Sequence, residues 1–208
     1  MKILRLVPRM VGSNCYIMIS EGVAAVIDPG VPSASIMQAI ESNNAKLSSI
    51  ILTHGHFDHM MGLDHLRTQN PEAEVMIHAD DAELMSDGHK NAFFTFFGRD
   101  RDFGAPDKLL IKGDEIPVGK EKLTVIHTPG HTKGSVCFKL GTVIFSGDTI
   151  MSDGYGRCDL YSSDTVKMNI SLNRLAELSQ KDPRIMIYPG HGEATSLSKA
   201  IKNIYNIQ

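Results

Sequence analysis

Apolar positions recur along the chain as short runs rich in β-branched residues, and this pattern predicts strands in two groups. In the first half the predicted strands cover residues 2–7, 15–20, 23–28, 48–53 and 74–79. In the second half they cover residues 123–128, 135–140, 142–147 and 184–190. Glycine, proline, serine or aspartate follows most of these runs, which is typical of strands that end in turns.

A second periodicity, with apolar residues three or four positions apart, predicts helices between and after these strands. Helices are expected over residues 33–44, with Ser33 as the N-cap, and over residues 58–68 and 164–179. Residues 80–87 predict a short helix, the last dozen residues are expected to be helical, and residues 88–108 are expected to be irregular. Each half therefore presents strands first and a helix later, which indicates an α/β sandwich of two sheets with helices outside.

The order of these elements does not fit a dinucleotide-binding fold, and no Gly-x-Gly-x-x-Gly follows the first strand. Nothing in the chain looks like a linker or a repeat, so we expect one domain over residues 1–208. Hydrophobic residues make up 42% and charged residues 22%, as in ordinary globular proteins, which excludes a disordered or fibrous chain.

The charge and the cysteines restrict partners and compartment. The formal net charge of −3 and the scattered lysines and arginines argue against a nucleic-acid partner. No apolar run reaches the roughly 18 residues of a membrane helix, and the first residues lack the features of a signal peptide. Three cysteines do not form a disulfide framework, so we expect a cytoplasmic protein that does not interact with membranes.

The stretch THGHFDHMMG (53–62) follows a predicted strand and concentrates groups that bind metals. Imidazole nitrogens and carboxylate oxygens are ligands of zinc and related metals. His54 and His56 can project the same way from an extended backbone, while Asp58 and His59 come from the following turn and point to a neighbouring position. The turn therefore offers two pairs of ligands for two adjacent ions.

Three further motifs supply candidates to complete both pairs. TPGHTKGS (128–135), SGDT (146–149) and PGHGE (189–193) contribute His131, Asp148 and His191. Each motif stands where an apolar strand meets a loop, which is where α/β folds gather their site residues.

In this order, the His-x-His-x-Asp-His turn and these three motifs resemble the metallo-β-lactamase superfamily over essentially the whole chain. The resemblance implies a four-layer αββα sandwich, in which two mixed sheets carry a dinuclear site at one edge. It implies a first metal held by His54, His56 and His131, a second held by Asp58, His59 and His191, and Asp148 bridging both.

The resemblance also implies the chemistry. The expected cofactors are two divalent ions, zinc in the first place, with iron or manganese as alternatives. A hydroxide shared by the ions would attack a carbonyl, with Asp58 and Asp148 as the catalytic carboxylates. Asp28 matches an aspartate that positions the ligand turn from outside the metal shell.

Residues 153–160 (DGYGRCDL) resemble a stretch found in short glyoxalase II-like hydrolases and in persulfide dioxygenases. This likeness implies that Arg157 contacts a substrate carboxylate, with Tyr155 and Lys133 as further substrate contacts. Residues 91–100 (NAFFTFFGRD) are a candidate lid or dimer contact, with Phe94 and Phe97 facing the substrate.

The first hypothesis is a hydrolase of a small anionic thioester or ester, such as S-lactoylglutathione. Alternatives are a persulfide dioxygenase with one iron, a lactonase or other ester hydrolase, and a metal-stabilised scaffold without activity. Met151 stands where acyl-homoserine lactonases have tyrosine, which weakens the lactonase hypothesis. Glutathione recognition, and the choice between a monomer and a homodimer, stay open.

Overall fold

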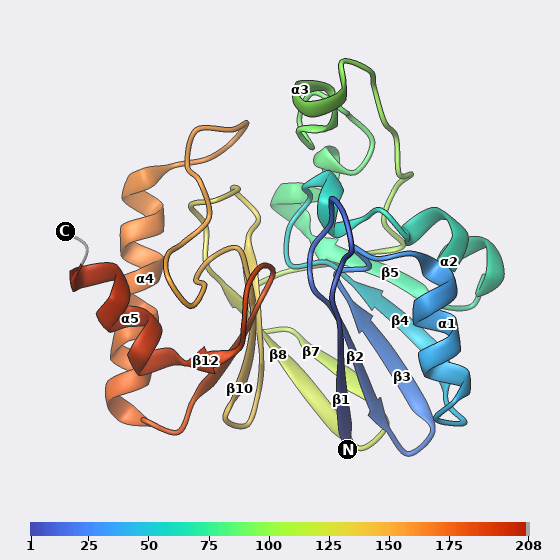
Figure 1. Ribbon diagram of the computed structural model, residues 1–208, viewed down its shortest axis with the longest axis horizontal. Coiled ribbons are helices and arrows are strands. Elements are labelled where there is room, and N and C mark those ends of the chain that lie inside the picture. The colour runs from blue at the N-terminus through green and yellow to red at the C-terminus, as the bar shows by residue number, and fades with distance from the viewer. Residues whose placement is uncertain (207–208) are drawn as a thin grey trace.

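Two six-stranded sheets face each other, and helices cover the outer face of each (Figure 1). This computed structural model describes residues 1–206. The architecture is the predicted α/β sandwich of two mixed sheets with helices outside, which is therefore confirmed.

The first sheet has the order β1-β2-β3-β4-β5-β6. Its strands are β1 (Lys2–Leu6), β2 (Cys15–Ser20), β3 (Val23–Ile27), β4 (Lys46–Ile51), β5 (Glu74–His78) and β6 (Lys108–Leu110). The first three strands form an antiparallel meander, and β3 to β6 pair in parallel. Parallel pairing brings the carboxyl ends of β3, β4 and β5 to the same edge.

The second sheet has the order β12-β11-β10-β9-β8-β7. Its strands are β7 (Glu115–Val118), β8 (Glu121–His127), β9 (Val136–Leu140), β10 (Val143–Gly147), β11 (Met186–Pro189) and β12 (Thr195–Ser196). Only β10 and β11 pair in parallel within this sheet. The carboxyl ends of these two strands therefore lie side by side.

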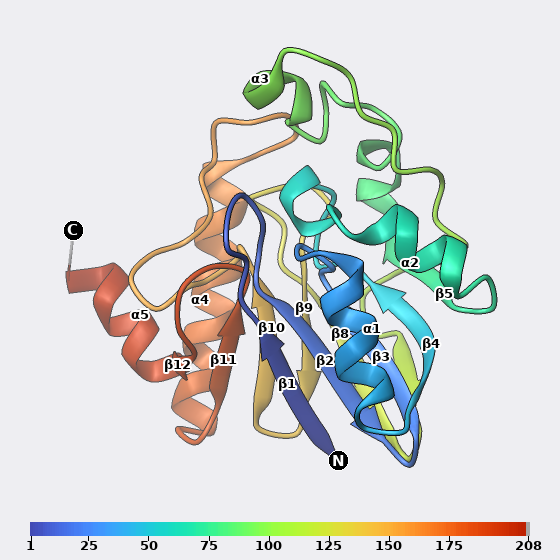
Figure 2. The ribbon, with the colours of Figure 1, turned by 45° about the vertical axis from the view of Figure 1, so that its right-hand side comes forward.

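The helices divide between the two sheets, as Figure 2 shows from a second direction. On the first sheet lie α1 (Ser33–Glu41) and α2 (Leu63–Gln69), and on the second lie α4 (Thr165–Lys181) and α5 (Leu197–Asn206). Two 3-10 turns, η1 (Phe57–His59) and η2 (Ala79–Leu84), and the short helix α3 (Phe93–Phe97) lie in the loops of the first half. Figure 1 shows α3 standing above the end of the two sheets.

Three apolar layers hold the sandwich together. The layer between the sheets includes Tyr16, Ile51, Phe138 and Phe145, which are almost fully buried. One outer layer joins the first sheet to α1 and α2, and the other joins the second sheet to α4 and α5. Strands that are buried on both faces, such as β2, consequently read as continuous apolar runs.

Several local predictions differ from the structure. Ser33, expected as the N-cap of the first helix, is its first residue, and the N-cap is Pro32, which makes no side-chain capping hydrogen bond. The short helix expected over residues 80–87 is the 3-10 turn η2.

The helix expected over residues 58–68 is divided into η1 and α2, and Gly62 is the N-cap of α2. A Cβ at Gly62 would overlap the carbonyl oxygen of Val31, so this cap requires glycine. Residues 88–108, expected to be irregular, contain α3. Its start is fixed by the side-chain oxygen of Asn91, which accepts a hydrogen bond from the backbone N–H of Phe93 at 3.0 Å.

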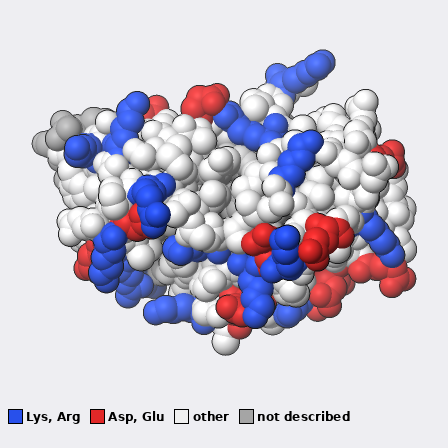
Figure 3. Space-filling model, turned by 90° about the horizontal axis from the view of Figure 1, so that it is seen from below, with Lys and Arg blue, Asp and Glu red and all other residues white. Residues whose placement is uncertain are grey.

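None of the helices in residues 1–206 combines the length and the apolarity that crossing a membrane requires. On the side of the molecule opposite α3, acidic and basic side chains are interspersed (Figure 3). This face offers no broad surface of one sign.

Candidate metal centre

The ligand turn begins directly after β4 and is buried almost completely. His54 and His56 are 1% and 3% exposed. Gly55 between them packs against η2, where a Cβ would lie 2.5 Å from Cβ of Leu84. The close packing of η2 therefore requires glycine between the two histidines, and it holds this part of the backbone in place.

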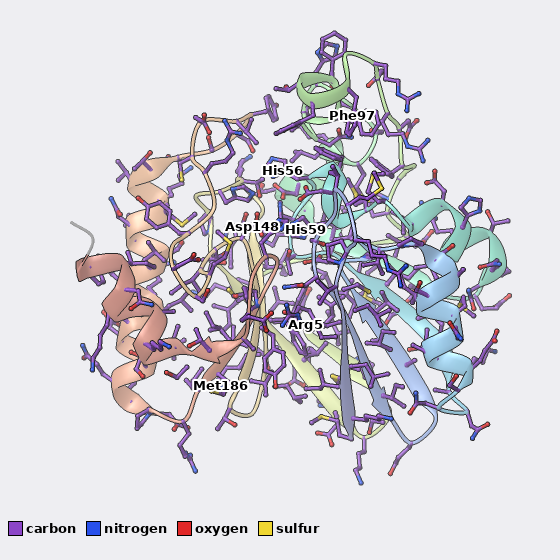
Figure 4. The ribbon with its side chains drawn as sticks, viewed as in Figure 1. Arg5, His56, His59, Phe97, Asp148 and Met186 are labelled. Carbon is purple, nitrogen blue, oxygen red and sulfur yellow. The ribbon has the colours of Figure 1, made fainter. Side chains whose placement is uncertain are left out.

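The other predicted ligands arrive from the second sheet. His131 lies in the loop between β8 and β9, Asp148 follows β10, and His191 follows β11. Figure 4 shows His56, His59 and Asp148 close together between the two halves of the sandwich. The structure thus brings all seven predicted metal ligands to one place, in three overlapping groups whose ligand atoms lie within 4.8 Å of one another.

The first group contains His54, His56 and His131. Nε2 of His131 lies 2.8 Å from Nδ1 of His56 and 3.2 Å from Nε2 of His54. Nδ1 of His131 donates a hydrogen bond to the carbonyl oxygen of Arg157 at 2.8 Å, so in the neutral imidazole the Nε2 atom carries a lone pair.

His54 is oriented in the same way. The hydroxyl of Thr53 donates to Oδ2 of Asp28 at 2.7 Å, and Nδ1 of His54 donates to the oxygen of that hydroxyl at 3.1 Å. Nε2 of neutral His54 therefore also carries a lone pair. Nε2 of His54 and Nε2 of His131 face each other at 3.2 Å, and two imidazole nitrogens that both offer lone pairs suit a shared cation.

The second group contains Asp58, His59 and His191. Nε2 of His191 lies 3.2 Å from Oδ2 of Asp58, and Nε2 of His59 lies 3.9 Å from the same oxygen. Asp148 lies between the groups, since its carboxylate oxygens are 3.4 Å from Nε2 of His59, 3.6 Å from that of His131 and 3.5 Å from that of His191.

Buried polar atoms without partners indicate that a cation fits here. Among the described residues, Nε2 of His56, Nε2 of His59 and Oδ1 of Asp148 are fully buried and make no hydrogen bond, although the last two face each other at 3.4 Å. Such atoms destabilise a protein unless something satisfies them. The donors are imidazole nitrogens and carboxylate oxygens, the set that suits zinc, iron or manganese. The residues present therefore fit the predicted divalent metal ions.

The pKa values divide the cluster into neutral and charged ligands. Burial lowers the pKa of His54 well below its usual value, and burial together with His131 lowers the pKa of His56 to about 3. Burial also opposes ionisation of Asp148, but the adjacent His59 and other histidines outweigh it and keep the pKa of this carboxyl well below its usual value. His54 and His56 are thus neutral at neutral pH and Asp148 is ionised, as metal coordination requires.

His59 differs from its neighbours. Burial opposes its protonation, but the carboxylates of Asp28, Asp58 and Asp148 surround the ring and raise its pKa well above the usual value. Nδ1 of His59 lies 2.9 Å from Oδ2 of Asp28 and donates to it, which leaves Nε2 directed at the cluster. The same carboxylates that attract a proton to Nε2 also attract a metal cation.

One functional carboxylate was missed by sequence reasoning. Asp81 in η2 is fully buried and accepts hydrogen bonds from the backbone N–H of Gly55 at 3.0 Å and of Gly134 at 2.6 Å. It also accepts a hydrogen bond from the hydroxyl of Thr132 at 2.6 Å. Asp81 therefore ties the His54–His56 turn to the loop that carries His131. Its only sequence signal is an acidic residue soon after an apolar strand, which is common in surface turns.

Within the described part of the chain, the side chains of Arg157, Lys133 and Tyr155 do not line the cavity at the metal cluster, although the carbonyl oxygen of Arg157 contacts His131. Arg157 pairs with Asp159, through contacts of 2.6 and 2.7 Å, and its side chain is 52% exposed. Lys133 lies 3.3 Å from a carboxylate oxygen of Asp80. Tyr155 packs against the apolar layer beneath α4 and α5.

The phenylalanine segment also differs from its predicted arrangement. Phe94 stacks on the ring of His89, with 4.0 Å between the ring centroids. Phe97 packs against Phe57 and Phe93 at 5.5 and 4.6 Å. In the described part of the chain, it is Phe96 and not Phe94 or Phe97 that lines the cavity at the metal cluster.

Comparison with known proteins adds relatives that resemble the whole chain. The sequence profile of the Metallo-beta-lactamase superfamily matches residues 8–191. The probable polyketide biosynthesis zinc-dependent hydrolase PksB of Bacillus subtilis is 30% identical over 92% of this chain and 78% of its own length. The hydroxyacylglutathione hydrolase of Buchnera aphidicola is 33% identical over 75% of this chain, but this match spans only 53% of that enzyme.

Solved structures agree with the fold over almost the full length. The protein TTHA1623, determined in a di-iron-bound form, superimposes with a TM-score of 0.83, covers 98% of both chains and is 28% identical. The B3 metallo-beta-lactamase BLEG-1 superimposes with a TM-score of 0.84, covers 97% of both chains and is 26% identical.

Proposed function

Since the chain belongs to the metallo-β-lactamase superfamily, we propose that it is a dinuclear metal-dependent hydrolase that cleaves a bond between an acyl group and a heteroatom. A thioester is the first substrate class to test. The expected membership of the superfamily is confirmed, while the glyoxalase II-like branch is part of this proposal.

The arrangement of seven side chains at one cavity carries the proposal. His54 and His131 direct lone pairs at each other, and the buried Nε2 of His59 and Oδ1 of Asp148 make no hydrogen bond among the described residues. Two groups of three ligands with Asp148 between them match two adjacent cations better than one. Four of these ligands line a cavity, which a substrate could enter; a metal site that only stabilised the fold would not need this access.

A pair of divalent ions at this site would support hydrolysis of a carbonyl compound. Two bound divalent ions would supply a water that is nucleophilic at neutral pH and a Lewis acid for the oxygen of the substrate carbonyl. Asp58 lines the cavity and holds its carboxylate 3.2 Å from Nε2 of His191, so it can orient an attacking water and accept its proton. Asp28 holds His59 in place, Asp81 holds the backbone between His54 and His56, and the carbonyl oxygen of Arg157 holds His131.

The relatives support the choice of metal and substrate class. The zinc-dependent hydrolase supports zinc, and the di-iron-bound structure supports iron as the alternative. The hydroxyacylglutathione hydrolase supports a thioester, although the match covers about half of that enzyme. Recognition of glutathione, a cytoplasmic location and the choice between monomer and dimer stay predictions.

The test is turnover by protein whose metals are known. The purified protein is loaded with zinc, its metal content is measured by mass spectrometry, and hydrolysis of S-lactoylglutathione and of simple acyl thioesters is followed. We expect close to two metal equivalents and turnover of at least one thioester, both lost in Asp148→Asn. Asp182→Asn is the matched control, because Asp182 pairs with Arg184 on the surface.

Two outcomes would overturn the proposal. Metal-loaded protein that hydrolyses no thioester or ester is not a hydrolase of this kind. Binding of a single iron, together with oxygen uptake on glutathione persulfide, would instead identify the dioxygenase alternative.

A further inference from the structure

A cavity of about 230 Å³ opens directly onto the metal cluster. Four of the predicted ligands form its floor, and the rest of its lining is apolar and consists of Val11, Phe57, Ala92, Phe96 and Leu160. The walls come from four segments: the loop before β2, the ligand turn itself, the segment that carries α3, and the loop after Asp148. Ligand sites typically combine such apolar walls with a few convergent polar groups.

The aromatic side of this wall is fixed to the ligand turn itself. The rings of Phe96 and Phe57 lie 5.5 Å apart, and Phe57 stands between His56 and Asp58 in the sequence. The backbone N–H of Phe57 donates to the carbonyl oxygen of Asn91 at 3.0 Å. The position of α3 is therefore set by the same turn that carries the ligands.

The backbone on either side of α3 holds it in this position. Ala92 has a φ of 69° and Gly98 a φ of 65°, both in the left-handed region. Alanine adopts that region at a cost, which other contacts must offset. Phe93, which is 5% exposed, packs against the rings of Phe57 and Phe97 and provides such contacts. Figure 4 shows Phe97 above His56, which places α3 over the site.

Two apolar side chains at the cavity are left largely open to solvent. Val11 and Phe96 are each 55% exposed, although they are anchored next to a buried core. Burial of such surface by a ligand is favourable by about 25 cal/mol per Å². The mouth of the site can therefore gain affinity from an apolar group that enters it.

The same cavity offers no cation to an anionic substrate. Among residues 1–206, no lysine or arginine belongs to its lining. Arg157 is engaged with Asp159, and Lys133 with Asp80. A carboxylate on the substrate beyond the reacting group would consequently meet an apolar wall and lose its hydration without a partner.

We propose that the substrate of this site carries an apolar, uncharged acyl group next to the scissile carbonyl, and that Val11, Phe96 and Leu160 select it. This inference rests on the proposed hydrolytic function, which it narrows to thioesters or esters of alkyl or aryl carboxylic acids. Phe96 is a specificity-determining residue of this site.

Two measurements on the zinc-loaded protein test the proposal. The first is binding of the product-like carboxylates acetate, butanoate, hexanoate and lactate by titration calorimetry, which does not depend on turnover. The second is kcat/KM for the N-acetylcysteamine thioesters of the same acids. We expect both affinity and kcat/KM to rise up to about four-fold per added methylene, the fold-change equivalent to roughly 0.8 kcal/mol.

Variants test whether the apolar wall of the cavity causes this dependence on chain length. Phe96→Ala and Val11→Ala should reduce the rise in carboxylate affinity and in kcat/KM from the acetyl to the hexanoyl compound about ten-fold or more, mainly through KM. Phe96→Leu should restore much of the gain, because it returns apolar surface without the ring. Met10→Ala is the matched control, since Met10 is 88% exposed next to Val11 and does not line the cavity.

The outcomes separate this inference from the function on which it rests. Carboxylate affinity that rises with chain length in a protein without any turnover supports the apolar site and overturns the hydrolase. Turnover without a chain-length dependence, or with S-lactoylglutathione as the best substrate, keeps the hydrolase and overturns the apolar site.

Discussion

Oδ2 of Asp28 lies 2.9 Å from Nδ1 of His59, and the carboxylate of Asp28 also accepts hydrogen bonds from both the backbone N–H and the hydroxyl of Thr53. Asp28 follows β3, whereas Thr53 and His59 flank the ligand turn after β4. One buried carboxylate thus sets the ring of His59 directly and the ring of His54 through Thr53. The neighbouring strands β3 and β4 thereby fix the tautomers of one histidine from each metal group.

Replacing Asp28 with asparagine should weaken metal binding without unfolding the protein. Asp28 has a φ of 51°, which asparagine tolerates as well as aspartate does. The amide keeps a hydrogen bond to Thr53 but removes the charge that orients His59. We expect metal affinity to fall about 10- to 100-fold, as for other outer-shell partners of metal ligands. Competition with a chromophoric chelator measures this.

Asp107→Asn serves as the control for Asp28→Asn, because Asp107 also accepts a backbone hydrogen bond, from Val75, but lies on the far part of the first sheet. It should leave metal affinity unchanged. Equal metal affinity in Asp28→Asn and the wild type would contradict the role assigned to Asp28.

Asp81→Asn should both destabilise the protein and loosen the first metal group. The carboxylate accepts three hydrogen bonds, from Gly55, Thr132 and Gly134, and an amide cannot accept all three in the same geometry. A buried donor left without a partner costs about 1–3 kcal/mol. Denaturant unfolding of the metal-free protein gives the stability change, and a metal titration of the same variant gives the affinity change.

Measuring both stability and metal affinity distinguishes a role of Asp81 in positioning the ligands from a role in stabilising the fold alone. Leu175→Ala, a change in the buried layer beneath α4, should lower the free energy of unfolding by about 2–5 kcal/mol and leave metal affinity nearly unchanged. If Asp81→Asn affected only stability, as Leu175→Ala should, Asp81 would be an ordinary core residue.

The fold and the ligand set follow closely from local patterns in the sequence. Strands such as β2 and β10 are short apolar runs that end in turns, and the motifs around His131, Asp148 and His191 stand at strand ends, so their convergence could be anticipated. The role of Asp81 could not be predicted from the sequence, because its hydrogen-bond partners are 26 to 53 residues away and no local pattern indicates these contacts.

The substrate side of the site could not be predicted from sequence for a similar reason. Arg157 has Asp159 two residues away, and a short-range ion pair on an exposed loop competes with any contact to a ligand. Within α3, all four phenylalanines look alike in sequence, and only tertiary packing decides that Phe96 faces the cavity while Phe94 stacks on His89.

The cysteines should differ sharply in reactivity. Burial raises the pKa of the Cys137 thiol to about 11 and that of Cys15 well above its usual value, so both are protonated at neutral pH. Burial and then Asp159 raise the pKa of Cys158 as well, but this residue is partly exposed. Because alkylation needs the thiolate, iodoacetamide at pH 7.5 should modify Cys158 slowly and the other two hardly at all.

Mass spectrometry after timed alkylation, with guanidinium-unfolded protein as the reference for three reactive thiols, checks this order. The rate at Cys158 should rise as the pH is raised through 8 and 9, because the thiolate fraction grows. Rapid labelling of Cys137 in the folded protein would contradict the burial of that strand.

Adding a single methyl group at Gly190 should displace a ligand of the metal centre. A Cβ there would overlap Oδ1 of Asp148 and lie 2.7 Å from Cε1 of His59, closer than side-chain atoms approach each other. Asp148 would have to move away from its place between the two ligand groups. We expect Gly190→Ala to lower metal affinity and turnover at least ten-fold.

Gly154 is the matched control, since a Cβ there would meet no atom within 4 Å. We expect Gly154→Ala to change the free energy of unfolding by no more than about 0.5 kcal/mol. Metal stoichiometry and unfolding curves of both variants test this prediction. Full metal occupancy in Gly190→Ala would show that metal binding does not require Asp148 to lie between the two ligand groups.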